Sequence, residues 1–277
     1  MRKLLSADFS RLVKDTIFRI VLAALSALSM VFCLMNYHTS IRFPGEPVYV
    51  EDVLFDMIPT LAFVCAAIIS MFLGQEFEEN TIRNKLIVGH TRASIYFSAY
   101  FTCMAASLAL LFAILIFSGV TGFFCFRAFL LDWTQLAHLS LCCVLLTMVF
   151  SAICVGFGMN IQKRAISMVV SLLTMLVLLF AASYLQGTLL EPEMIYDGVT
   201  ISMDGVQYGD LVKNPVYVEG NTRAVMEFLF DLLPEGQCIQ MNNLQLERCA
   251  RWPWMSAVML LVTTVLGYLP FRKRDIR

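Results

Sequence analysis

The chain has 277 residues, of which 59% are hydrophobic and 15% are charged, and its formal net charge is −1. A soluble domain averages about 45–50% apolar and about 25% charged residues, so this composition excludes an ordinary soluble globular protein. The near-zero charge gives no support to nucleic-acid binding, and the mean hydropathy of +0.74 predicts a chain that crosses a membrane several times.

Apolar runs long enough to cross a bilayer recur along the chain. A spanning helix needs ~20 mostly apolar residues. Six runs meet that requirement, at about 17–36, 53–73, 94–122, 135–159, 165–186 and 253–271. The third run is longer than a bilayer requires, which predicts a tilted helix or one broken near Gly119 and Gly122. Residues 1–277 are therefore expected to form a single all-α membrane domain with six transmembrane helices.

Lysine and arginine are distributed unevenly between the two sides that six spans create. An even number of spans places both termini on one side, and that side holds 14 of the 20 basic residues. The six basic residues of the other side are Arg42, Arg127, Lys213, Arg223, Arg248 and Arg251. Because Lys and Arg concentrate in short cytoplasmic loops, both termini are predicted to be cytoplasmic.

The N-terminal segment, residues 1–19, leads into the first span with the pattern of an amphipathic helix. The apolar face carries Leu5, Phe9, Leu12 and Ile20, and the basic face carries Arg11 and Lys14. This pattern predicts a helix lying in the cytoplasmic membrane interface. A plain basic anchor ahead of the first span is the alternative.

The cytoplasmic loop 74–93, which begins GQEFEENTIRNKLIVGHTR, is unusually polar for its place between two apolar runs. Glu79 and Arg83 have the spacing of a favourable i, i+4 pair. Gly89 fits the residue that follows a helix C-terminus, and Thr91 fits the N-cap of the next span. The loop is predicted to contain a short helix, and a solvated loop that only orients the spans is the alternative.

The longest loop, 187–252, is predicted to form a small extracellular cap. Polar turns in its first part are typical of short strands or irregular structure, and TRAVMEFLFDLLPEGQ has the pattern of an amphipathic helix with Thr222 as a candidate N-cap. The apolar side of that helix carries Val225, Phe228, Leu229, Leu232 and Leu233. Cys238 and Cys249 can form a disulfide outside a cell, but their spacing alone leaves the pairing open.

Two enzyme classes can be tested against the sequence. Glu78, Glu79 and Arg83 fit the E-E-x-x-x-R motif of intramembrane metalloproteases, but that chemistry needs histidines inside the bilayer. The three histidines are His38, His90 and His138, at span ends or in a loop. No Gly-Lys dipeptide occurs, so the chain lacks the G-x-x-x-x-G-K-[ST] loop that holds ATP phosphates. The sequence predicts no catalytic residues, no metal site and no cofactor on this chain.

Three segments share a residue pattern with one transporter family. The loop 74–96, the basic opening LLSADFSRLVKD and the basic tail FRKRDIR resemble permease subunits of the ABC-2 family of ATP-binding-cassette transporters, in particular small Gram-positive bacterial permeases. In layout the resemblance covers the whole chain, including the six spans and the large outer loop before the last one. In residue pattern it covers only 1–20, 74–96 and 265–277.

The resemblance implies a non-catalytic transport subunit in a bacterial plasma membrane, with the layout of a type V exporter. In that family the loop is the coupling helix that docks on a separate ATPase, which binds ATP and magnesium. Carried over by position, the docking residues are Glu76, Glu78, Glu79, Arg83, Asn84 and Lys85. The resemblance also implies a second permease subunit, identical or different, and export of an amphiphilic cargo such as an antimicrobial peptide or a drug-like molecule. The helix after Thr222 would close the exit path, and a helix lying flat on the outer leaflet is the alternative.

Two other functions stay open at this stage. An ion-coupled secondary transporter or channel usually keeps ionisable residues inside the membrane. The central parts of the six spans carry no Asp, Glu, Lys or Arg, which argues against this class, although backbone carbonyls can also bind sodium. A non-transporting subunit that anchors a sensor or an assembly in the membrane is the second alternative.

Overall fold

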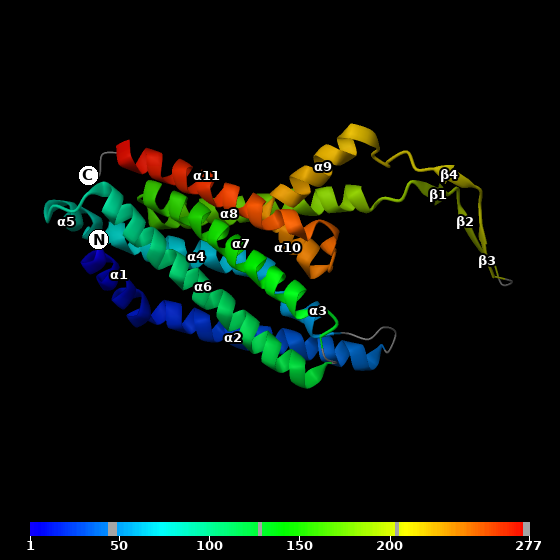
Figure 1. The fold of residues 1–277 in the computed structure, drawn as a ribbon, viewed down its shortest axis with the longest axis horizontal. Helices are drawn as coiled ribbons and strands as arrows, with labels where there is room; N and C mark the ends of the chain where they lie inside the picture. Colours follow the sequence, from blue (N-terminus) through cyan, green and yellow to red (C-terminus); the bar gives the residue numbers. More distant parts are fainter. Residues whose placement is uncertain (44–48, 127–128, 203–204, 274–277) are drawn as a thin grey trace.

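The computed structural model describes residues 1–43, 49–126, 129–202 and 205–273, and helices dominate it (Figure 1). The six long helices are α2 (Thr16–Arg42), α4 (Ile58–Glu78), α6 (Arg92–Cys125), α7 (Trp133–Asn160), α8 (Arg164–Leu190) and α11 (Trp252–Lys273). The short helices are α1 (Arg2–Lys14), α3 (Val50–Leu54), α5 (Thr81–Ile87), α9 (Gly220–Leu232), α10 (Pro234–Asn242) and the 3-10 helix η1 (Leu246–Arg251). The strands are β1 (Met194–Tyr196), β2 (Val199–Ser202), β3 (Gly205–Tyr208) and β4 (Leu211–Lys213).

Within the described ranges, six helices are long and apolar enough to cross a membrane, which confirms the predicted number of spans. Each helix contains or closely overlaps one predicted run, and α3 precedes α4 within the second span. The predicted break in the third span is wrong, because α6 is continuous through Gly119 and Gly122. Gly122 instead admits a neighbour, since a Cβ there would lie 3.1 Å from Val50 Cγ1 on α3.

The six long helices divide into central and peripheral members of one bundle. The most apolar windows of α4 and α7 are 67% and 61% buried, whereas those of α8 and α11 are only 22% and 17% buried. Large apolar side chains such as Phe180 and Leu261 therefore face outward, where a bilayer would surround them. Inside, Ser70 of α4 donates a hydrogen bond to Ser171 of α8 at 3.2 Å, a type of contact that holds helices together where lipid competes for apolar faces.

The N-terminal helix α1 begins, and α11 ends, at the same end of the bundle, near α5 (Figure 1). Arg92, which begins α6, donates from Nη1 to the Arg272 carbonyl of α11 at 3.3 Å. We call this end the termini end, and the opposite end, which carries α3, α9 and α10, the far end. This placement agrees with an even number of spans.

The segment that follows α8 extends from the far end and then returns to it. Two antiparallel strand pairs, β1 with β4 and β2 with β3, form the extended part, and Figure 1 shows them projecting beyond the helices. The helix predicted over TRAVMEFLFDLLPEGQ is confirmed only as far as Leu232, as α9; the chain is extended at Leu233, and PEGQ begins the separate helix α10. Helix α9 begins at Gly220 with Glu219 as N-cap, so Thr222 lies within the first turn and is not the cap.

Candidate functional site

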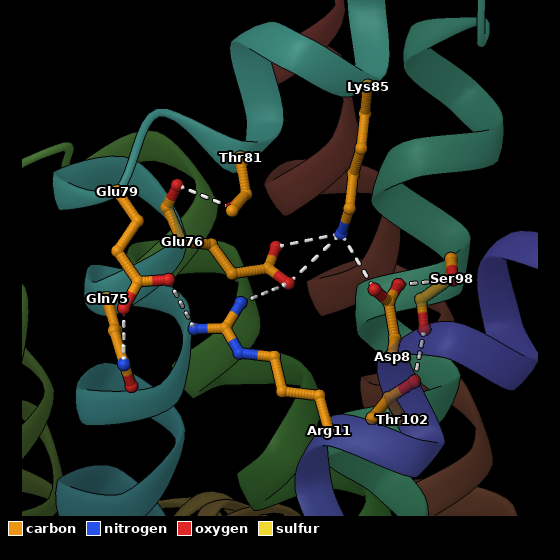
Figure 2. A network of polar contacts seen from close by, with 9 residues as sticks. All are labelled: Asp8, Arg11, Gln75, Glu76, Glu79, Thr81, Lys85, Ser98 and Thr102. Carbon is orange, nitrogen blue, oxygen red and sulfur yellow. Dashed lines mark hydrogen bonds and ion pairs between the residues drawn. The ribbon is translucent and has the colours of Figure 1, made fainter.

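A cluster of charged side chains lies among α1, α4, α5 and α6 at the termini end (Figure 2). It consists of Asp8, Arg11, Glu76 and Lys85 with the hydroxyl of Ser98, and we call it the ion cluster. Two carboxylates and two cations make it formally neutral. Because it joins α1 to α4, α5 and α6, it links the N-terminal helix to residues at least 65 positions further along the chain.

Helix α1 brings Asp8 inward on a stripe formed by Leu4, Asp8 and Leu12, which are all buried. The helix ends at Asp15, whose Oδ1 accepts hydrogen bonds from the backbone N–H groups of Ile17 and Phe18 at 2.7 and 3.4 Å and so caps α2. The predicted amphipathic helix is therefore present, but its burial differs from the prediction.

Of the apolar face predicted for this segment, Leu12 alone is buried, while Phe9 and Ile20 face outward. The reason is that the acid of α1 pairs with a lysine of α5, which turns the Leu4, Asp8 and Leu12 side toward the bundle. Location in the membrane interface is a separate matter and stays a prediction.

Local turn chemistry sets the position of α5. Asn80, in the left-handed region at φ 55°, separates α5 from α4, and Thr81 Oγ1 donates to the Glu76 carbonyl at 2.8 Å. At the other end, Gly89 has φ 95°, and the N–H groups of Gly89 and His90 donate to the carbonyls of Leu86 and Lys85 at 3.0 and 3.1 Å. These two bonds form a Schellman motif. The predicted role of Gly89 is confirmed.

The next helix also starts as predicted. Thr91 Oγ1 accepts a hydrogen bond from the Ser94 N–H at 3.2 Å, which confirms Thr91 as the N-cap of α6. The loop is therefore a rigid unit of helix, Schellman turn and capped helix. A segment built in this way moves as a body more readily than it bends.

The distances inside the ion cluster are those of direct ion pairs. Lys85 Nζ lies 2.8 Å from Asp8 Oδ1 and 3.0 Å from Glu76 Oε1. Arg11 Nη1 lies 3.2 Å from the same Glu76 oxygen, and Ser98 Oγ donates to Asp8 Oδ2 at 2.6 Å. Glu76 is 1% exposed, so removal of either cation would leave charge without compensation in a site shielded from water.

Arg11 also connects α1 to the end of α4. Its guanidinium lies over the ring of Phe72 at 5.3 Å and reaches Glu79 Oε2 at 3.5 Å. Lys85 therefore holds α5 to α1 and α4 through its ion pairs with Asp8 and Glu76. Asp8 also connects α1 to α6, because it accepts a hydrogen bond from Ser98. The arrangement is suited to transmitting force between helices.

The structure divides the six predicted docking residues into two groups. Glu76 and Lys85 point into the ion cluster, where they hold the loop instead of facing a partner. Glu78, Glu79, Arg83 and Asn84 are exposed. Of these, Glu78 lies 3.8 Å from Arg164 at the start of α8.

Sequence reasoning missed the apolar part of the exposed surface. Ile87 and Val88 are 73% and 78% exposed at the tip of α5. A groove of about 310 Å³ runs beside them between α1 and α5, lined by Leu4, Thr81, Asn84, Lys85, Val88 and His90. An apolar pair directly before Gly89, in a loop otherwise rich in charge, was the available signal.

Four of the five residues predicted for the gate helix lie on α9, and Leu233 is its C-cap; most of them are directed away from the bundle. Val225, Phe228 and Leu229 are exposed, whereas Leu232 and Leu233 are partly buried. The helix is attached through Phe230, which packs with Ala182 and Leu185 of α8. Neither closure of an exit path nor contact with the outer leaflet follows from this placement, and both stay predictions.

Cys238 and Cys249 are free thiols in the structure, so the disulfide left open by the sequence is not formed. Cys238 is fully buried in α10, whereas Cys249 lies on η1 and is partly exposed. Burial raises the pKa of the Cys238 thiol well above its usual range, so this thiol stays protonated and unreactive.

No protein-family model and no curated protein matches the chain. The fold itself defines the class. The protein is an all-α, multi-pass membrane protein with six helices able to span a bilayer within the described residues. Its termini-end site joins a surface helix to the bundle through buried ion pairs.

Proposed function

We propose that the protein is the membrane-spanning subunit of an ABC-2-type ATP-binding-cassette transporter, and that α5 is the helix on which a separate ATPase docks. One observation carries this proposal: α5 exposes an apolar tip while its Lys85 is bound to buried carboxylates of two other helices. A surface contact is thereby linked to the interior of the bundle.

The outward surface of α5 has the composition of a small protein interface. Ile87 and Val88 form an apolar centre, and Arg83 and Asn84 supply polar groups beside it. Interface cores are depleted in charge and are surrounded by polar rims. If the termini end is cytoplasmic, as the positive-inside rule predicts, this tip lies in water, where its exposure is unfavourable and a docked partner would cover it.

The ion cluster supplies the route from that surface to the spans. A push on α5 moves Lys85, and Lys85 is held within 3.0 Å of Asp8 on α1 and Glu76 on α4. Rigid elements joined by buried contacts shift together. Closure of an ATPase would thus displace α1, α4 and, through Ser98, α6 as one group.

The remaining parts of the proposal rest on the resemblance. ATP and magnesium would bind to the ATPase, two permease subunits would enclose the path, and an amphiphilic peptide or drug-like molecule would leave the cell. The plasma membrane of a bacterium is the matching location. The peripheral helices α8 and α11, with large apolar side chains outward, leave room for a second subunit or for lipid.

Co-purification tests docking and coupling separately. The full chain is purified in detergent with a candidate ABC ATPase, as wild type, Val88→Asp and Lys85→Met. We expect Val88→Asp to lose co-elution at an unchanged unfolding temperature. We expect Lys85→Met to keep co-elution but to lose the change in ATPase rate that the permease causes. If the wild type retains no ATPase, the docking proposal fails.

The ion cluster also offers one observation for the ion-coupled alternative, since buried carboxylates near the end of a span can carry protons. Here Lys85 and Arg11 neutralise both carboxylates, which favours a structural joint. Reconstituted liposomes distinguish the two functions. Uptake driven by a pH gradient without ATP, and lost in Glu76→Gln, would support the ion-coupled transporter.

A further inference from the structure

Glu235 at the far end is a buried acid without the partners that the ion cluster provides. It lies in the first turn of α10, is 0% exposed, and neither carboxyl oxygen has a hydrogen-bond partner among the described residues. Glu51, equally buried at the same end, differs in that its Oε1 accepts from the Leu130 and Leu131 N–H groups at 2.6 and 2.8 Å. Burial at this end therefore does not by itself leave an acid without donors.

Helix α10 is fixed in place around Glu235. It packs against α4, α7, α8 and α9. Gln237 Nε2 donates to the Asp231 carbonyl at 2.7 Å, and Ser256 Oγ of α11 donates to Gln237 Oε1 at 2.9 Å. Gly236 lies against the Phe230 carbonyl so closely that a Cβ would overlap with it. Together these contacts hold Glu235 in the interior and leave its side chain no route to water unless α10 moves.

The ionisable groups around α10 do not compensate a negative charge on Glu235. From α9 come Glu227 and Asp231, which pair with Arg248 of η1 at 2.7 and 3.5 Å, and Arg223, which pairs with Glu227 at 3.3 Å. Asp56 lies just before α4, and α10 itself carries Cys238. Helix α7 carries His138, Cys142 and Cys143. The charge of Arg251 in η1 is directed to Asp231. Tyr184 of α8 is exposed. The cations of α8 and α11 lie toward the termini end; they are Arg164, Arg272 and Lys273.

A carboxylate placed here would be an unpaired buried charge, which is among the least favourable arrangements in a protein. The group is expected to bind a proton instead. Burial raises the pKa of Glu235 to about 8, from an ordinary value of 4.5.

We propose that Glu235 is a proton-binding site: its carboxyl carries a proton while α10 is seated between α4, α7 and α8, and loss of that proton releases α10 together with α9. The proposal concerns the far end alone and does not rest on the transporter function, so either can fail without the other.

The sign of the pH dependence follows from proton binding in the two states. Seated, Glu235 keeps its proton up to about pH 8; released into water, it loses the proton above its ordinary pKa of 4.5. Between these values the seated state binds more protons, so acid favours it and rising pH favours release. The ratio of released to seated molecules should rise by up to about tenfold per pH unit in this window and level off above it.

Hydrogen exchange measured by mass spectrometry tests this on the full chain in lipid nanodiscs between pH 5 and pH 9. After correction for intrinsic exchange, we expect opening of residues 234–242 to increase with pH in the wild type. Glu235→Gln, which copies the neutral carboxyl in shape, should remove the increase, and Glu247→Gln, at an exposed acid nearby, should keep it. Equal pH slopes in the wild type and Glu235→Gln would overturn the proposal.

Cys238, one turn beyond Glu235 and fully buried, provides a second readout in a Cys249→Ser background. A maleimide should label Cys238 faster in the wild type than in Glu235→Gln at pH 8.5, and this difference should shrink as the pH is lowered toward 5. A purely electrostatic effect has the opposite sign, because removal of the Glu235 charge lowers the thiol pKa and speeds labelling. Faster labelling of Glu235→Gln at pH 8.5 would therefore contradict release of α10.

Discussion

The two ends of the bundle bury acids in opposite ways. At the termini end, Asp8 and Glu76 have Lys85 and Arg11 within 3.2 Å. At the far end, Glu235 has no cation and no hydrogen-bond donor from the described part of the chain. The first arrangement gives each acid a cationic partner and acts as a joint between helices. The second is stable only in its neutral form and therefore responds to pH.

The largest effect is expected where the joint loses its central cation. Lys85→Met leaves Asp8 without a cation and Glu76 with Arg11 alone, and removal of one partner of a buried pair costs about 3–5 kcal/mol. Unfolding of the purified protein in nanodiscs measures this loss. The double variant Lys85→Met/Asp8→Asn, which removes the charge left behind, should recover part of it, and a double variant no more stable than Lys85→Met would contradict the pairing.

A slightly smaller loss of stability than that of Lys85→Met is expected for an alanine substitution on the buried side of α5, and almost none on its exposed side. Ile82 is 1% exposed and Ile87 is 73% exposed, so Ile82→Ala should lower the free energy of unfolding by about 2–4 kcal/mol through the cavity it leaves. Ile87→Ala should change it by less than about 0.5 kcal/mol while weakening retention of a bound ATPase. If the two variants are equally destabilised, α5 is not oriented as described, and its tip is not a free surface.

The acids at the two ends should respond to the same substitution with different pH profiles. Near pH 4.5 the free energy of unfolding of Glu235→Gln should match that of the wild type. As the pH rises to about 8, the wild type loses stability and the variant does not, so their difference should grow by up to about 1.4 kcal/mol per pH unit. Glu76→Gln should be destabilised across this range, because it removes the anion between Lys85 and Arg11. Unfolding curves at pH 5, 6.5 and 8 measure both, and a parallel response of the two variants would remove the contrast.

The elements predicted correctly are those with local signals. Length and hydropathy are enough to place six spans, and turn chemistry is enough for Gly89 and Thr91. The ion cluster depends instead on contacts of α1 with residues 65 to 90 positions further along the chain, such as Arg11 with Glu76 and Asp8 with Lys85. An acid between Leu4 and Leu12 on an apolar stripe indicates a buried partner, but no local pattern says which residue that is.

The far end shows the same limit. The sequence of α10, PEGQCIQMN, carries several polar residues, yet tertiary packing buries most of it. Trp252 and Trp254 flank Pro253 at the start of α11, yet Trp252 is buried and Trp254 is 78% exposed. Residues two positions apart on an α-helix point about 200° apart, so the helix rotation, fixed by packing, decides which aromatic faces outward.

The smallest predicted effect compares a glycine from each end. A Cβ at Gly89 would meet nothing within 4 Å, but its φ of 95° is unfavourable for other residues, so Gly89→Ala should cost about 1 kcal/mol through backbone strain alone. At Gly236 the Cβ would collide with the Phe230 carbonyl, and α10 must shift to accommodate it. Gly236→Ala should therefore raise hydrogen exchange in α10 even at pH 5, whereas Gly89→Ala leaves α10 unchanged. A protected α10 in Gly236→Ala would mean that the close contact between Gly236 and the Phe230 carbonyl does not hold α10 in place.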